Sequence, residues 1–473
     1  MLFSSTVFLF LFLPIVLLAY YICPKKLRNT LLLIVSLFFY AWGEPAFVPI
    51  MLFSILMNYT FGLIVDKVRE RRTAIRLTMT LMVLSNVSLL CYYKYAIFFV
   101  ENINGLFNSS FAVPEILLPL GISFYTFHSM SYVIDVYRKH GDVQKNPINM
   151  ALYIAFFPQL VAGPLVRYQT VAAQLKHRVE TFDKFTEGVK RFIIGLAKKM
   201  LLANNVGLIA DEIFKTPTNE LSVGMAWIGI IAYSLQIYFD FSGYSDMAIG
   251  LAKMFGIDFL ENFNYPYVSR TISEFWRRWH ISLGTWFRDY VYIPLGGSKK
   301  GKLITYRNLF AVWFITGFWH GASWTFVAWG LYFGIIIAIE KAFLEKLIFK
   351  LWRPLQHMYA LVLIISGWVL FRAETFSYAF GYLKVMFGFG NVPLFDERAA
   401  FYLTNYSVLL CLAIISATPL FKWLMEKLFT TGSNKVFVIG NEIGAPVYYA
   451  AVLLLSIAYM VNATFNPFIY FRF

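Results

Sequence analysis

The chain contains little charge and little cysteine. Only 14% of its 473 residues are Asp, Glu, Lys or Arg, whereas a soluble domain carries about 25%. This shortage excludes ordinary soluble enzymes and disordered chains. Its three cysteines, Cys23, Cys91 and Cys411, lie within or beside apolar runs and lack metal-ligand spacing. Neither a disulfide scaffold nor a cysteine metal site is therefore expected.

Long apolar runs take the place of the missing charge. Apolar residues make up 59% of the chain and aromatic residues 19%. The runs are unbroken, whereas a membrane β-barrel needs short segments of alternating polarity. The sequence therefore predicts an all-α, polytopic integral membrane protein.

The apolar runs predict the positions of the membrane helices. Residues 308–342 are long enough for two passes or for one broken helix, whereas 150–162 are too short to span and predict a re-entrant or interfacial piece, followed by an amphipathic helix. We expect roughly ten to twelve embedded helices in a single domain over residues 1–473. The expected spans are Thr6–Cys23, Leu31–Trp42, Phe47–Val65, Leu77–Val100, Leu117–Tyr137, and about 191–210, 223–250, 308–342, 357–372, 402–428 and 445–464.

The net charge of +15 is carried largely by short basic clusters between the apolar runs. Clusters at Lys25–Arg28, Lys67–Arg72 and Arg138–His140 are typical of cytoplasmic loops. All three can be cytoplasmic only if the N-terminus lies outside, with the polar loop Asn102–Pro114 outside as well. This pattern favours contact with anionic lipid rather than with nucleic acid.

Two carboxylates interrupt an apolar run at residues 238–246. Asp240 and Asp246 are six positions apart, about 240° around a helix, so they do not share a face. Ionisable groups at membrane depth are costly and often functional. Two interpretations remain open here: a polar cluster that pins neighbouring helices, and a part of a substrate path.

Residues 265–297 form a second region rich in aromatic and charged residues. Ser273 is a candidate N-cap for a helix that would extend through His280. On such a helix Trp276 and His280 share one face, and Glu274 and Arg278 form an i, i+4 ion pair. The same pattern has an alternative interpretation without a functional site: an interfacial amphipathic helix with a belt of Trp and Arg.

His320 lies in an apolar stretch without a charged neighbour for about ten residues on either side. Gly317, Gly321 and Ala322 leave room beside its ring. A buried histidine of this kind is either structural or a neutral imidazole that can accept a proton from a hydroxyl. The histidines at 128, 140, 177 and 357 lack such a setting, and we interpret them as structural or interfacial.

Several motifs together resemble the membrane-bound O-acyltransferase (MBOAT) family, and more narrowly its bacterial branch similar to alginate O-acetyltransferases. The similarity extends from the N-terminus to about residue 372, with a motif-bearing core at about 117–372. Residues 373–473 are assigned by hydropathy alone. The motifs are Phe239–Gly250, Phe275–Leu283 and Phe318–Trp324, extended by Met1–Phe10, Leu120–Phe127 and Phe157–Pro164.

This resemblance implies a ring of helices around a thin central tunnel. It implies that His320 is the signature catalytic histidine and acts as general base, and that His280 is the second catalytic position. His280 could donate to the oxyanion, relay the proton or position the donor. Arg277 and Arg278 are candidates for binding the donor phosphates. The remaining candidate tunnel or substrate residues are Trp276, Trp319, Asp240 and Asp246.

The resemblance also implies the reaction and its partners. Acetyl-CoA would be the cytoplasmic donor substrate, with no bound cofactor and no metal. The acceptor would be an extracytoplasmic polysaccharide similar to alginate, cellulose or peptidoglycan, reached with an SGNH-type acetyltransferase partner at the bacterial cytoplasmic (inner) membrane. A transporter or flippase, and a non-catalytic scaffold of a polysaccharide-modification complex, are the rival classes.

Overall fold

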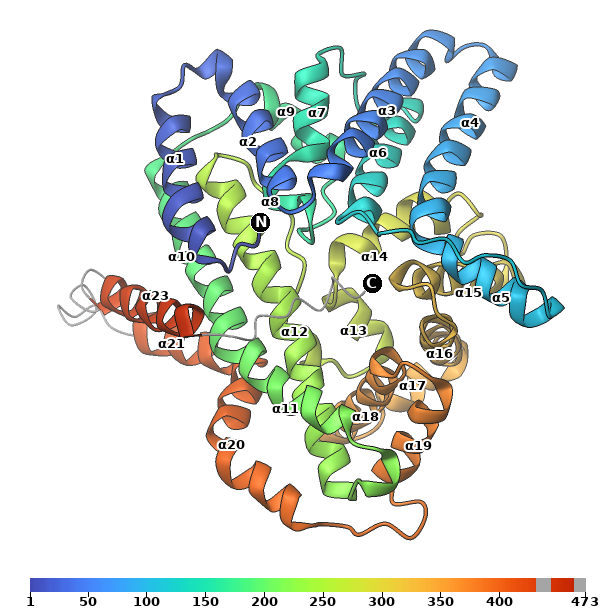
Figure 1. The fold of residues 1–473 in the computed structure, drawn as a ribbon, viewed down its shortest axis with the longest axis vertical. Helices are drawn as coiled ribbons and strands as arrows, with labels where there is room; N and C mark the ends of the chain where they lie inside the picture. Colours follow the sequence, from blue (N-terminus) through green and yellow to red (C-terminus); the bar gives the residue numbers. More distant parts are fainter. Residues whose placement is uncertain (431–443, 463–473) are drawn as a thin grey trace. The chain divides into compact units, whose positions relative to one another are not determined.

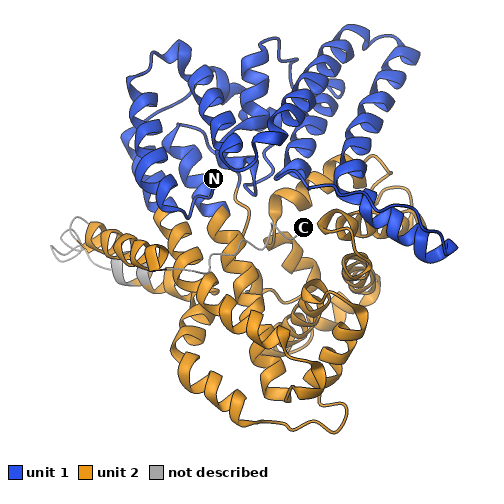
Figure 2. Cartoon of the chain, in the orientation of Figure 1, with its two compact units in different colours: residues 1–192, 245–260 blue, residues 193–244, 261–473 orange. Residues whose placement is uncertain are grey.

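The computed structural model describes residues 1–430 and 444–462, and all the elements assigned in this part of the chain are helical (Figure 1). The chain divides into two compact units (Figure 2). Unit 1 consists of Met1–Phe192 and Ser245–Leu260, and unit 2 of Ile193–Tyr244 and the residues from Glu261 onward. Helices α10 and α12 each contribute residues to both units. That the whole chain is one domain stays a prediction.

Unit 1 holds the first nine α-helices and most of the tenth. Its core contains a cluster of phenylalanines, in which the rings of Phe3 and Phe8 have centroids 5.1 Å apart and those of Phe39 and Phe157 are 5.4 Å apart. The helices are α1 (Leu13–Ile22), α2 (Arg28–Gly43), α3 (Val48–Val68), α4 (Arg72–Leu90), α5 (Ala96–Phe107), α6 (Ile122–Tyr137), α7 (Pro147–Ala155), α8 (Phe157–Leu160), α9 (Tyr168–Lys176) and α10 (Phe182–Ala197).

Unit 2 holds the helices that carry most of the candidate site residues. They are α11 (Asn204–Lys215), α12 (Val223–Met254), α13 (Ile272–Arg278), α14 (Ile281–Phe287), α15 (Lys302–His320), α16 (Trp324–Ile339), α17 (Glu345–Ile348), α18 (Arg353–Arg372), α19 (Phe376–Met386), α20 (Glu397–Ser416), α21 (Leu420–Thr430) and α23 (Ala445–Asn462).

Within the described residues, eight helices are long and apolar enough to cross a membrane, and Phe8–Ile22 is a shorter apolar helix. A chain buried in lipid must satisfy its backbone polar groups internally, and long helices do so. The predicted class, an all-α polytopic membrane protein, is confirmed. The eight are Pro45–Val68, Arg72–Phe107, Phe182–Lys215, Val223–Met254, Trp324–Ile348, Arg353–Arg372, Glu397–Ser416 and Ala445–Asn462.

The structure refines several predicted boundaries. The stretch 308–342 is interrupted at residues 321–323, between α15 and α16, and 402–428 is divided between α20 and α21. The expected polar loop Asn102–Pro114 begins too early, because α5 continues to Phe107 and ends at Asn108 in a left-handed conformation. Helix α19 was not predicted, and residues 463–464 of the last expected span lie outside the described residues.

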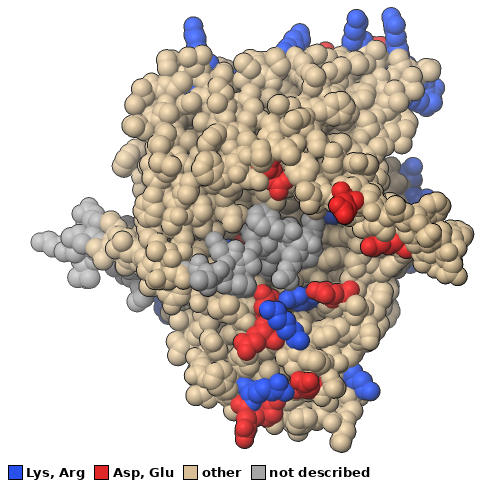
Figure 3. All heavy atoms as spheres, in the orientation of Figure 1, with Lys and Arg blue, Asp and Glu red and all other residues tan. Residues whose placement is uncertain are grey.

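The three basic clusters lie along one edge of unit 1. Arg69 at the end of α3, Lys139 after α6 and Lys176 at the end of α9 line one hollow, and Lys176 also lines a second hollow with Lys25. Figure 3 shows Lys and Arg side chains gathered along this edge, at the top of the view. If the three basic clusters lie on the same side of the membrane, they must lie along the same edge of the unit, as they do. That this side is cytoplasmic stays a prediction.

Candidate active site

His280 adopts a backbone conformation that residues other than glycine rarely adopt. Its φ is 45° and its ψ is 52°, at the junction between α13 and α14. Two backbone hydrogen bonds hold this junction against the preceding segment: Asn264 donates to the carbonyl of Arg278, and Ile281 donates to the carbonyl of Asn262, each at 3.0 Å. A conformation of this kind costs on the order of 1–3 kcal/mol and is concentrated at functional sites.

This geometry corrects the prediction of one helix extending through His280. Helix α13 ends at Arg278, so Trp276 and His280 do not share a helical face. The predicted N-cap, Ser273, is also wrong: Thr271 caps the helix, and its hydroxyl accepts a hydrogen bond from the Glu274 amide at 3.1 Å. The predicted pair is confirmed, because Arg278 Nη2 lies 3.0 Å from Glu274 Oε1.

Asn262 fixes the tautomer of the His280 imidazole. The side-chain oxygen of Asn262 accepts the backbone N–H of Ser282 at 3.2 Å, which an amide nitrogen could not do. The same oxygen lies 3.1 Å from His280 Nδ1, so Nδ1 must be the donor. In a neutral imidazole the proton is then on Nδ1, and Nε2 keeps its lone pair.

The free nitrogen of His280 is buried. The residue is only 2% exposed, and Nε2 has no hydrogen-bond partner among the described residues. Burial lowers the pKa of the His280 imidazole to about 3, because the charged form loses its hydration. His280 is therefore a neutral imidazole with an available acceptor at neutral pH.

His320 is the last residue of α15 and is 4% exposed. The hairpin of α15 and α16 brings it to the site because the two helices pack at glycines. A Cβ at Gly317 would lie 2.4 Å from the carbonyl oxygen of Phe326, and a Cβ at Gly330 would lie 2.4 Å from that of Trp313. Any larger residue at these positions would push the helices apart.

Aromatic rings surround both histidines within unit 2. The His320 ring meets Trp329 and Phe371 edge to face, with centroids 4.9 and 5.3 Å away. The His280 ring meets Phe241 in the same way at 4.6 Å. Trp319 is their shared neighbour, 4.9 Å from His320 and 6.4 Å from His280. The structure thus places both predicted histidines around one indole.

Trp276 and the two arginines lie in the segment before His280. Trp276 packs against Trp313, with centroids 4.8 Å apart, and against Phe333 at 5.1 Å. Arg278 is held by Glu274, whereas Arg277 is exposed. Of the two candidate phosphate-binding residues, only Arg277 has a side chain without a partner among the described residues. The tunnel role of Trp276 and the binding of donor phosphates by Arg277 and Arg278 stay predictions.

The two carboxylates of α12 form ion pairs with the long helix that runs from Phe182 to Lys215. Asp240 lies 2.7 Å from Lys199 Nζ, and both side chains are at most 4% exposed. Asp246 lies 2.6 Å from Arg191. These pairs are what the polar-cluster interpretation expects. A part in the substrate path stays untested.

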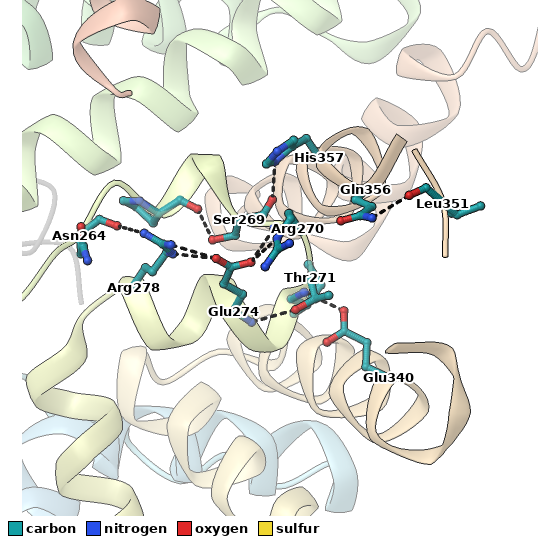
Figure 4. Close-up of polar contacts among 12 residues, drawn as sticks. Asn264, Ser269, Arg270, Thr271, Glu274, Arg278, Glu340, Leu351, Gln356 and His357 are labelled. Atoms are coloured by element: carbon teal, nitrogen blue, oxygen red, sulfur yellow. Dashed lines mark hydrogen bonds and ion pairs between the residues drawn. The ribbon is translucent and has the colours of Figure 1, made fainter. Parts of the chain in front are cut away.

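Glu340 is a functional candidate that the sequence analysis missed. Its carboxylate is 1% exposed, and it accepts the amides of Ile272 at 2.7 Å and of Ser273 at 2.8 Å. It also accepts the hydroxyls of Ser273 at 2.7 Å and of Tyr359 at 3.1 Å. Figure 4 shows Glu340 at the start of α13, beside Thr271. The available signal was a carboxylate at the end of the apolar run 308–342.

No cluster of metal-ligating side chains accompanies this arrangement in the described part of the chain. Residues 1–430 and 444–462 contain no group of three or more His, Cys, Asp and Glu side chains that could hold a metal ion. The expectation that the reaction uses no metal and no bound cofactor stays a prediction. The site presents two buried imidazoles, His280 and His320, among aromatic rings, and an imidazole can transfer a proton to and from a hydroxyl.

Comparison with known proteins gives a consistent result. The family model described as MBOAT, membrane-bound O-acyltransferase family, matches residues 34–372. The chain is 42% identical to the "Probable alginate O-acetylase AlgI" of Azotobacter vinelandii, with 100% of both chains covered. It is 46% identical to the protein of the same name from Pseudomonas aeruginosa, over 85% of this chain and 77% of that one. It is 35% identical to the "Peptidoglycan O-acetyltransferase" of Helicobacter pylori, over 100% of this chain and 98% of that one.

Proposed function

This chain belongs to the membrane-bound O-acyltransferase family, and we propose that it transfers acetyl groups from acetyl-CoA for the O-acetylation of an extracytoplasmic polysaccharide. The resemblance found in its motifs is confirmed by relatives named as alginate and peptidoglycan acetylating enzymes. The proposed acceptor class follows from those names, and alginate-like and peptidoglycan-like polymers are the candidates.

One observation carries the catalytic part of the proposal: two buried histidines share Trp319 as a neighbour. We assign His320 as the general base. The acceptor hydroxyl attacks the thioester carbonyl carbon, a C–O bond forms and the C–S bond breaks. His320 takes the hydroxyl proton and passes it to the departing thiolate. Where water is excluded, each dipole directed at the developing oxyanion interacts with it more strongly.

His280 takes a supporting role in this mechanism. While neutral it carries its proton on Nδ1 towards Asn262, so it has no N–H to offer an oxyanion from Nε2. Its Nε2 lone pair can instead accept a hydrogen bond from a second hydroxyl of a sugar acceptor. This assignment favours orientation of the acceptor over the oxyanion-donor role that the sequence left open.

The remaining assignments concern topology and partners. We propose that the protein lies in the bacterial inner membrane with its basic clusters in the cytoplasm, and that an SGNH-type acetyltransferase completes the transfer outside. Labelling of a single cysteine introduced at Arg71 tests the orientation. An impermeant reagent added to intact cells should leave that cysteine unlabelled, and labelling would contradict the proposed topology.

Complementation of a deletion strain tests the function. We expect the wild-type gene to restore acetyl esters on the wall or exopolysaccharide, measured by mass spectrometry. His320→Gln keeps a side chain of similar size but cannot carry a proton, and it should lower acetylation by about 10²-fold or more. His140→Gln, at an exposed position, is the matched control and should behave as wild type.

Two outcomes would contradict the proposal. The first is a His320→Gln protein, present at normal levels, that retains more than about a tenth of wild-type acetylation. The second is the absence of labelled ester when purified wild-type protein in lipid is given radiolabelled acetyl-CoA, the polymer and the partner. A transporter or scaffold would release no labelled ester in that assay, whereas the proposed enzyme must do so.

A further inference from the structure

A basic hollow in unit 1 is not used by the mechanism. It has a volume of about 670 Å³ and is formed by the α1–α2 connection, the start of α7 and the end of α9. Five Lys and Arg side chains line it against a single carboxylate, Glu180. The five are Lys25, Lys26, Arg28, Lys176 and Arg178. Such an excess of positive charge in one concave site is suited to a multiply charged anion.

The floor of the hollow is built from two ordered arginines. Arg28 forms an ion pair with Glu180, and its Nε donates to the carbonyl of Cys23 at 3.2 Å. Arg178 donates to the hydroxyl of Tyr20 at 3.2 Å and to the side-chain oxygen of Asn29 at 2.5 Å. These contacts fix the guanidinium groups in advance, so binding an anion does not have to order them.

The rim of the hollow consists of lysines with no partner. Lys25, Lys26 and Lys176 are exposed, and none has an ion pair or side-chain hydrogen bond within the described residues. A neighbouring hollow of about 610 Å³ differs in this respect, because it contains Asp66 and Asp142 and its Arg69 is paired with Asp66. Uncompensated charge is therefore concentrated in the first hollow.

Exposed apolar side chains lie on α1 and on the connection that carries Lys25 and Lys26. Leu18 and Ile22 on α1 are 66% and 74% exposed, and Leu27, directly after Lys26, is 55% exposed. A soluble phosphate needs only the cations. A ligand that also uses this apolar surface must be an amphiphile, with its charged group in the hollow and its chains along α1.

We propose that this hollow binds the phosphate-bearing headgroup of an anionic phospholipid. Basic pockets between membrane helices are suited to such headgroups, since lysine and arginine neutralise the phosphate while the acyl chains stay in the bilayer. The proposal does not depend on the acetyl-transfer function, because the hollow lies in unit 1 and the candidate histidines lie in unit 2.

Native mass spectrometry of the purified full-length protein tests this site. After delipidation in detergent, the protein is given phosphatidylglycerol or phosphatidylcholine at equal concentration. The triple variant Lys25→Ala, Lys26→Ala, Lys176→Ala should lower retention of phosphatidylglycerol by about tenfold or more, since each lysine near an anionic headgroup contributes several-fold. The same three lysines changed to Arg should keep the binding.

The control removes the same charge from the same unit outside the hollow. Lys67, Arg71 and Arg72 are exposed and do not line the hollow, so Lys67→Ala, Arg71→Ala, Arg72→Ala should lower retention several-fold less than the triple variant of the hollow does. Equal losses in both triple variants, or equal retention of phosphatidylcholine by the wild type, would overturn the proposal. Displacement of the lipid by millimolar inorganic phosphate or coenzyme A would assign the hollow to a soluble phosphate and overturn it as well.

Discussion

The carboxylate of Glu340 accepts both the backbone amide and the hydroxyl of Ser273, at 2.8 and 2.7 Å. This contact joins the residue that follows α16, whose Trp329 packs on His320, to the start of α13, which leads to His280. One buried carboxylate thus connects the helix that packs on His320 to the helix that leads to His280.

Glu340→Gln should lower both stability and acetyl transfer. One carboxylate oxygen becomes an NH₂ group that faces donors, so charge-assisted hydrogen bonds are lost at a cost of about 2 kcal/mol. Thermal unfolding in detergent measures the first effect and polymer acetylation the second. Glu374→Gln, at an exposed glutamate, is the control and should change neither.

A double-mutant cycle separates positioning from general stability. Ser273→Ala removes one partner of Glu340, so Glu340→Gln should cost less in the Ser273→Ala background than in the wild type. Equal costs in the two backgrounds would show that the pair does not act as a unit.

Asn262→Asp should move the acid side of the pH profile to higher pH. A carboxylate keeps the acceptor for His280 Nδ1 but stabilises the imidazolium, so it should raise the pKa of His280 from about 3 towards the usual range. The pH profile of kcat/KM should then show acetyl transfer falling on the acid side at a higher pH than in the wild type. An unchanged pH profile in folded protein would show that Asn262 does not set the pKa of His280.

Arg277→Gln should raise the KM for acetyl-CoA more than it lowers kcat, if this exposed guanidinium binds donor phosphates. Steady-state kinetics at varied acetyl-CoA give both constants. Lys302→Gln removes an exposed positive charge at the start of α15 and should leave both constants near wild type. An unchanged KM in Arg277→Gln would leave Arg277 as a surface anchor.

Glu180 should make stability depend on pH in the acid range. Burial alone would raise the pKa of Glu180, but hydrogen bonds from Tyr20 and Arg28 outweigh it and hold the pKa below 4.5. Because the pKa of Glu180 is lower in the folded state, the ionised carboxylate stabilises the fold fully above the ordinary value of 4.5. This contribution is lost as the pH falls through the folded-state pKa. The melting temperature of wild type should therefore fall more steeply below pH 4.5 than that of Glu180→Gln. Glu70→Gln, at a carboxylate that is 89% exposed, should follow the wild-type curve.

The sequence alone determined the class of the protein and singled out His280 and His320 as candidates among its six histidines. Hydropathy is enough to predict long helices, because in lipid the backbone must bond within its own segment. An interruption within 308–342, though not its position, and the pair of Glu274 with Arg278 were also predicted, since both depend on neighbours close in the chain. His280 and His320 became candidates through local motifs for the same reason, and their catalytic roles stay predictions.

Only the tertiary structure decided how those residues are presented. The left-handed turn at His280 depends on two backbone hydrogen bonds, Asn264 to Arg278 and Ile281 to Asn262, which join residues 14 and 19 positions apart and which no local helix propensity describes. The tautomer of His280 depends on Asn262, and the start of α13 depends on Glu340, 67 positions beyond Ser273. Helix periodicity relates residues three or four apart, whereas buried polar groups are satisfied by whichever partner folding brings near.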